Sequence, residues 1–177
     1  MPTIDLVYQS EQGASNWTNL NNTRLNNNSY STATNVNSEI QMVLNDLPSD
    51  AESVNSVQII MEDIAVVSKV SATGQIQTVI RDSGANYYSE EHTYVNVSVS
   101  DSAGTVHTTS NGTDKWTVEQ VNGLNIHLSL VAGSPVGSGG VIIDFLALRV
   151  DYNIPAASSI IKLSQGFVKL ASGKVTI

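Results

Sequence analysis

The chain has 177 residues, of which 41% are hydrophobic and 14% are charged. This length allows one domain with a single buried core, and the composition excludes both a disordered polar chain and a coiled coil. The net charge of −8 argues against a nucleic-acid partner, because phosphate binding needs clustered Lys and Arg. No apolar run approaches the roughly 18 residues that span a bilayer, and the first residues do not resemble a signal peptide, so we expect a soluble protein with no membrane partner.

Alternation of apolar and polar residues predicts a series of half-buried strands. Apolar residues recur at every second position over 40–44, 57–61, 95–99 and 124–130, and Ile76-Thr78-Ile80 follows the same alternation. The segment 141–150 is apolar on both faces, which favours a central strand that is covered on both sides. Asp144 interrupts this segment. We expect Asp144 to face outward, because a buried carboxylate would need a partner such as Arg149 or Lys69.

The segments between these strands are rich in turn-forming residues. Nine asparagines lie between Asn16 and Asn37, which favours an ordered surface loop of Asx turns. The dipeptides Asn111-Gly112 and Asn122-Gly123 predict turns with positive φ, and the second leads into the strand that begins at Leu124. No stretch carries the apolar stripe of a helix, so the sequence predicts an all-β fold, a jelly-roll β-sandwich over residues 1–153. It leaves open whether residues 1–15 form the first strand or an arm.

Residues 154–177 differ from the rest in charge and predict a C-terminal arm. Three of the eight bases and none of the sixteen acids lie there, so residues 1–153 carry a net charge of −11. A linker at 155–159 precedes two short apolar runs. Three interpretations remain open: a final strand folded back on its own domain, a disordered tail, or an extended arm on a neighbouring subunit, which the opposite charges support.

No motif predicts a catalytic residue, a metal site or a cofactor, and we do not expect an enzyme. The chain lacks cysteine, and its histidines, at 92, 107 and 127, have no metal-ligand spacing. Glu90-Glu91-His92 could approach one cation, but neighbouring strand residues point to opposite faces, so we expect a solvated loop. The glycine-rich segment 133–140 lacks the Lys-Ser/Thr of a phosphate loop and predicts a flexible connection.

The aromatic residues allow two interpretations. They could form a platform for sugars, because flat rings suit the apolar faces of saccharides, or they could be ordinary packing within the sandwich, which we favour. Two exposed rings close together would support the platform. The residues concerned are Trp17, Tyr30, Tyr87, Tyr88, Tyr94 and Trp116.

Several short motifs resemble, in their order, the jelly-roll structural proteins of tailed bacteriophages. They are Trp17-Thr18-Asn19-Leu20-Asn21-Asn22, Asn28-Ser29-Tyr30, Val54-Asn55-Ser56-Val57-Gln58-Ile59, Val79-Ile80-Arg81-Asp82, Trp116 ahead of Leu124-Asn125-Ile126, and Asp144 to Tyr152. The first motif often reads Trp-x-Asn-Pro-x-Asn-Ala in those proteins and ends in Ser-Tyr-Ala. Here Leu20, Thr23 and Ser31 replace the proline and the two alanines.

The resemblance implies a jelly-roll fold and a structural role, with no shared catalytic residues. Such domains serve as capsid cement or decoration proteins and as parts of tail fibres. We therefore expect a virion protein on the capsid exterior, a homotrimer that binds the major capsid protein and its own neighbouring subunits. The alternative is a tail-fibre or other carbohydrate-binding module with a glycan ligand.

If the arm makes these contacts, its apolar residues anchor it and its lysines pair with acids on the partner. The predicted partner-binding residues are Ile160, Ile161, Lys162, Leu163, Phe167, Val168, Lys169, Leu170 and Lys174.

Overall fold

The computed structural model describes residues 2–12, 17–33, 38–67, 73–82, 85–95, 100–133, 140–155, 160–163 and 166–169. Almost all regular structure in these ranges is strand. The strands are β1 (Thr3–Gln12), β2 (Trp17–Thr18), β3 (Ser31–Ala33), β4 (Glu39–Leu44), β5 (Ser53–Val67), β6 (Thr73–Arg81), β7 (Asn86–Val95), β8 (Ser100–Ala103), β9 (Asn125–Gly133), β10 (Gly140–Ile143), β11 (Phe145–Asn153), β12 (Ile160–Leu163) and β13 (Gly166–Lys169). A 3₁₀ helix, η1 (Leu20–Thr23), and a short helix, α1 (Val118–Asn122), complete the elements.

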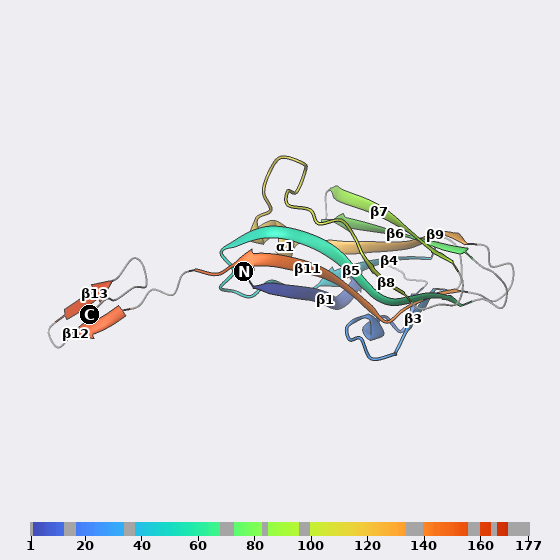
Figure 1. The fold of residues 1–177 in the computed structure, drawn as a ribbon, viewed down its shortest axis with the longest axis horizontal. Helices are drawn as coiled ribbons and strands as arrows, with labels where there is room; N and C mark the ends of the chain where they lie inside the picture. The colour runs from blue at the N-terminus through green and yellow to red at the C-terminus, as the bar shows by residue number, and fades with distance from the viewer. Residues whose placement is uncertain are drawn as a thin grey trace.

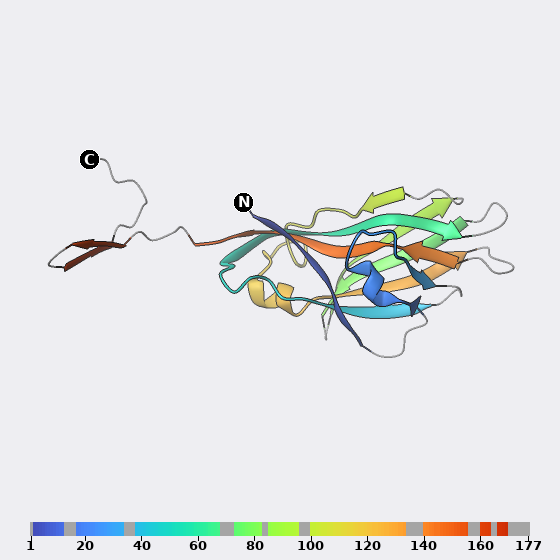
Figure 2. The ribbon, with the colours of Figure 1, turned by 90° about the horizontal axis from the view of Figure 1, so that it is seen from below.

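The strand pairing is that of a jelly roll. Strands from the two ends of the sandwich sequence pair with each other, and each further pair lies inside the previous one along the chain. The four antiparallel pairs are β1 with β11, β4 with β9, β5 with β8, and β6 with β7. The pairs assemble into two layers, β8-β5-β11-β1 and β4-β9-β6-β7, while β10, β3 and β2 extend the first layer beside β5 (Figures 1 and 2). This nesting, with the two layers packed face to face, confirms the predicted all-β jelly-roll sandwich.

β1 joins the two layers and shows that the N-terminal segment is the first strand of the sandwich. Thr3 to Val7 pair with β11, and from Tyr8 onward the strand pairs with β4 instead. The register shifts between Tyr8 and Ser10, where the strand passes from one sheet to the other. Such an irregularity increases the local twist and lets one strand serve two sheets.

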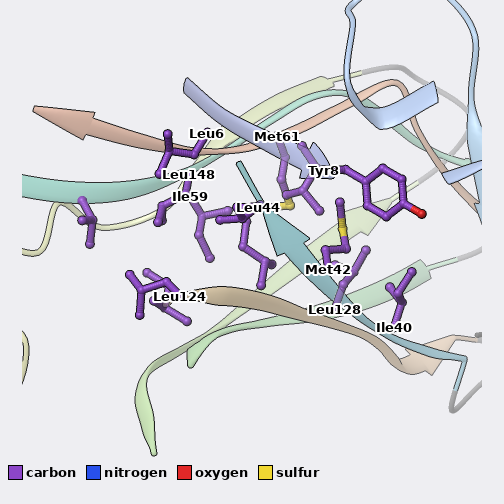
Figure 3. Close-up of a cluster of buried hydrophobic side chains, with 14 of the residues drawn as sticks. Leu6, Tyr8, Ile40, Met42, Leu44, Ile59, Met61, Leu124, Leu128 and Leu148 are labelled. Carbon is purple, nitrogen blue, oxygen red and sulfur yellow. The ribbon is translucent and has the colours of Figure 1, made fainter. Parts of the chain in front are cut away.

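The core lies between the layers and contains the apolar residues that the alternation predicts (Figure 3). Ile40, Met42 and Leu44 of β4 face Leu6, Ile59 and Leu148 from the opposite layer, and all are nearly inaccessible to solvent. The predicted segments 40–44, 57–61, 76–80 and 124–130 coincide with β4, β5, β6 and β9. For the segment 95–99, Val95 ends β7, and 96–99 lie outside the described residues.

The apolar segment 141–150 is a pair of consecutive strands, β10 and β11, separated by Asp144. Leu146 and Leu148 point into the core, and Ala147, on the other face, is also fully buried. Two-sided burial therefore holds in the middle of β11. It ends at Arg149, whose side chain remains 40% exposed.

The two predicted Asn-Gly turns differ in the structure. Gly112 has φ +85°, and the Asn111 side chain accepts hydrogen bonds from the backbone N–H groups of Thr113 and Asp114, as expected for an Asx turn. Gly123 instead has φ −90° and ends α1, so the prediction of positive φ there was wrong. Helix α1, which was not among the predicted elements, begins with a capping box. The Thr117 hydroxyl oxygen accepts from the Gln120 N–H, and the Gln120 side-chain oxygen accepts from the Thr117 N–H.

Candidate functional site

The C-terminal strands form a sheet of their own. β12 pairs antiparallel with β13, from Ile160 opposite Lys169 to Leu163 opposite Gly166. Within the described residues, neither strand pairs with the sandwich, and Figure 1 shows them beyond the end of β11. Leu170 and Lys174 of the predicted contact set lie outside the described residues. The role of the arm in partner binding stays a prediction.

Beside the end of β11, the first residues of β1 form a polar surface. Arg149 donates two hydrogen bonds to the Asp5 carboxylate, from Nε at 2.8 Å and from Nη2 at 2.9 Å, and this contact raises the pKa of Arg149. Thr3, Asp5 and Arg149 line an open hollow of about 350 Å³. Arg149 is therefore already paired with Asp5, and it does not reach the carboxylate of Asp144.

Asp144 is fully buried, so the expectation that it faces outward was wrong. Its Oδ2 accepts hydrogen bonds from the backbone N–H groups of Asn27 and Asn28, at 2.9 and 2.6 Å. Its Oδ1 accepts a third, from Ser29 at 3.1 Å. The charge of Asp144 is thus stabilised by the loop's backbone, and neither Arg149 nor Lys69 is needed.

These contacts also explain the order of the asparagine-rich loop. Asn27 Oδ1 accepts from the N–H of Ser29, and both Asn19 and Asn28 have positive φ, which asparagine tolerates well. The predicted loop with an Asx turn is found between η1 and β3, but β2, η1 and β3 are regular elements, so the prediction of Asx turns throughout the segment was wrong. Residues 16 and 34–37 lie outside the described residues. Asp144 holds this loop against the junction of β10 and β11. It therefore stabilises the fold.

A second carboxylate, the partly buried Glu90 on β7, lies between two histidines. Glu90 Oε1 is 2.9 Å from His107 Nε2, and Oε2 is 3.8 Å from His92 Nε2. The Thr105 N–H donates to the same carboxylate at 3.0 Å. Glu90 and His92 share one face of β7, because they are two positions apart, so the expectation of a solvated loop was wrong.

The surroundings of His107 show that this cluster joins the two layers. The His107 N–H donates to the C=O of Val57 on β5 at 2.9 Å, and the His107 C=O accepts from the Val57 N–H at 3.0 Å. The His107 ring contacts Glu90 on β7. The ring also stacks on Tyr88, with centroids 3.5 Å apart. Burial lowers the pKa of His92, and the nearby Glu90 opposes this effect. The geometry favours a structural connection over a reactive site.

Four of the six aromatic residues, the two tryptophans, Tyr87 and Tyr88, pack within the sandwich, as we favoured. Trp17 and Trp116 are only 5% and 3% exposed. Tyr87 and Tyr88 are half-buried, with ring centroids 5.3 and 6.2 Å from that of Trp116. The Tyr87 hydroxyl donates to Asp82 at 2.7 Å, a contact that raises the pKa of Tyr87. These four rings therefore offer no open platform; Tyr30 lies half-buried in the asparagine-rich loop and Tyr94 lies in β7.

Among the residues that the structure describes, no three His, Asp or Glu side chains come together in a way that could hold a metal ion. No helix among the described residues is long and apolar enough to cross a membrane.

The fold thus defines the class of the protein, an antiparallel jelly-roll sandwich followed by a separate two-stranded sheet. No protein-family model matches the sequence, and no curated protein is similar to it. Among solved structures, the chain is similar to a truncated AlyQ with CBM32 and alginate lyase domains, at 15% sequence identity and a TM-score of 0.47. The similarity covers 89% of this chain and 35% of that one, so the chain spans about a third of its length. The fold assignment rests on the strand pairing.

Proposed function

We propose that the protein is a structural subunit of a bacteriophage virion, a cement protein that binds the capsid exterior. In this proposal, residues 154–177 bind the major capsid protein and neighbouring copies of the chain. The observation that carries the proposal is the separate β12–β13 sheet. Its two strands pair with each other, and within the described residues neither pairs with a strand of the sandwich.

An isolated two-stranded sheet supports an assembly role for a physical reason. A hairpin of four-residue strands is marginally stable in water at best, because it buries little apolar surface. The sequence of this one is nonetheless apolar, with Ile160, Ile161 and Leu163 in one strand and Phe167 and Val168 in the other. Binding to a partner surface would bury these residues and stabilise the pairing.

Charge supports the same role. The arm carries three lysines and no acid, and residues 1–153 carry a net charge of −11. Such an arm is attracted to acidic surfaces, including the sandwich of another copy. The jelly-roll topology and the order of the sequence motifs are consistent with the resemblance to phage structural proteins.

The test is binding to heads purified from the phage that encodes the chain and stripped of this protein. We expect the full chain to sediment with the heads and to raise their thermal disruption temperature. A variant that ends at Pro155 should fold but remain in the supernatant. Equal binding of both forms would contradict the role of the arm, and no binding by either form would contradict the cement function.

The carbohydrate-binding alternative remains open for the same protein. A glycan array would distinguish it, because a tail-fibre module should bind defined glycans whether or not the arm is present. We expect no glycan to bind the full chain.

A further inference from the structure

The first half of β1 is the open edge of a sheet. Thr3 to Val7 pair with β11 on one side, and β4 joins β1 only from Tyr8 onward. Open edges carry unpaired backbone groups that can hydrogen-bond to a further strand.

The hydrogen bonds at both ends of this segment show which groups point to the open side. Val7 bonds away from β11: its N–H donates to Asn45 Oδ1 at 2.6 Å, and its C=O accepts from the Asn45 N–H at 3.1 Å. Pro2 bonds toward β11, because its C=O accepts from the Tyr152 N–H. Backbone direction alternates along a strand, so the N–H and C=O groups of Thr3 and Asp5 also point away from β11. Within the described residues, nothing is hydrogen-bonded to these four groups from the open side.

We propose that this edge of β1, Thr3 to Leu6, receives a strand from the C-terminal arm of a second copy of the chain, in the segment Ile160–Leu163. The inference deepens the proposed function, because it names the surface on which the arm binds a neighbouring subunit. Addition of a strand to an open edge gives affinity through main-chain hydrogen bonds, and the length of β12 matches the free part of the edge.

The position of the arm favours this edge over the other open strands. Thr3 lies opposite Asp151, so the edge begins where the chain leaves the sandwich (Figures 1 and 2). Only six residues, 154–159, connect β11 to β12, and they span about 20 Å at most. When copies gather around an axis at this end, each arm can reach the β1 edge of its neighbour within that length.

Charge complementarity supports the same occupant. An arm with three lysines and no acid approaches a sandwich with a net charge of −11. The open hollow at Thr3, Asp5 and Arg149 and a second of about 390 Å³ at Val7, Asn21, Arg24 and Leu25 both lie along the outward residues of β1. Leu25, which lines the second hollow, is 66% exposed.

Disulfide trapping between single-cysteine chains tests the inference, because the natural sequence contains no cysteine. Thr3→Cys protein is mixed with protein that carries one cysteine at 160, 161, 162 or 163, and the mixture is oxidised. We expect covalent dimers of the two chains, with yields that alternate between even and odd arm positions, since strand residues alternate between faces. The control is Ser89→Cys on β7, an exposed residue on the edge strand of the other layer.

A second variant tests the edge without cysteine. Thr3→Pro removes one N–H on the open side and leaves the β11 pairing intact, and proline is tolerated on such an edge. We expect it to weaken self-association of the full chain by about tenfold, while Thr3→Val should have little effect.

The outcomes separate this inference from the proposed function. Failure of Thr3→Cys to trap the arm, equal trapping by Ser89→Cys, or unchanged association of Thr3→Pro would overturn the inference, even if the arm still binds heads. Trapping with the expected alternation would support it, even if head binding proved independent of the arm.

Discussion

Asp144 accepts a hydrogen bond at 2.6 Å from the backbone N–H of Asn28, a residue 116 positions earlier in the chain. The contact connects the junction of β10 and β11 to the asparagine-rich loop that precedes β3. Because Asp144 is fully buried, its charge depends on these loop N–H groups. The ordered loop and the buried carboxylate therefore require each other.

The first expectation concerns this carboxylate. Asp144→Asn preserves the shape of the side chain but removes its charge and places an N–H₂ group where only acceptors fit. Hydrogen bonds to charged groups contribute about 1.5–3 kcal/mol each, so we expect a loss of about 2–3 kcal/mol in the free energy of unfolding. Urea denaturation measures it. Asp50→Asn, at an exposed residue, is the control and should change stability by less than about 0.5 kcal/mol; an equal effect of both variants would contradict the role of Asp144.

The second expectation concerns the contact between Gly104 and Glu90. A Cβ at Gly104 would collide with Glu90 Oε2. The carboxylate cannot easily move away, because Oε2 accepts from the Thr105 N–H and Oε1 contacts His107 Nε2. Gly104→Ala should therefore displace the carboxylate and cost about 1–3 kcal/mol. In a Glu90→Ala background the same substitution should cost much less, because the obstructing atoms are gone. A double-mutant cycle by urea denaturation measures the difference, and additive effects would contradict the proposed contact.

The third expectation is a pH dependence from His92. Burial lowers its pKa in the folded protein below the ordinary value of 6.5, despite the opposing effect of Glu90. The unfolded chain therefore binds a proton more readily than the folded one, and protonation favours unfolding. Stability from this group should be complete above pH 6.5 and be lost as the pH falls through the lowered pKa.

His92→Gln provides the comparison, because it keeps a polar side chain near Thr78 without a titratable group. We expect the stability of the natural protein to fall more steeply than that of His92→Gln between pH 7 and pH 5. Thermal or urea unfolding across this range measures both slopes. Parallel slopes would show that His92 does not contribute.

Much of the fold could be predicted from the sequence because sandwich strands alternate visibly between core and solvent. β4, β5 and β9 each place apolar residues such as Met42 or Leu128 at every second position, and β6 does so except at the buried Thr78. β7 was less visible, because its inward face at Tyr88, Glu90 and His92 is largely polar. The signal was present in their spacing of two. Helix α1 had a signal too, the capping-box residues Thr117 and Gln120.

The partners of the polar residues could not be predicted from the sequence, because they depend on the topology. His107 contacts Glu90 across 17 positions and Asp144 contacts Asn28 across 116. Each pairing brings together elements whose neighbours are fixed only by the order of strands in the jelly roll. Likewise, the open edge at Thr3 and Asp5 follows from the departure of β1 to the second sheet at Tyr8, which no local pattern indicates.

The most direct measurement is the mass in solution, by light scattering, of the full chain and of a variant that ends at Pro155. We expect the full chain to be a trimer and the variant to be a folded monomer. The free energy of unfolding of the variant should be close to that of the full-length chain after its trimer has dissociated. A monomeric full chain, or a variant that associates as the full chain does, would contradict the central claim that the arm holds neighbouring subunits together.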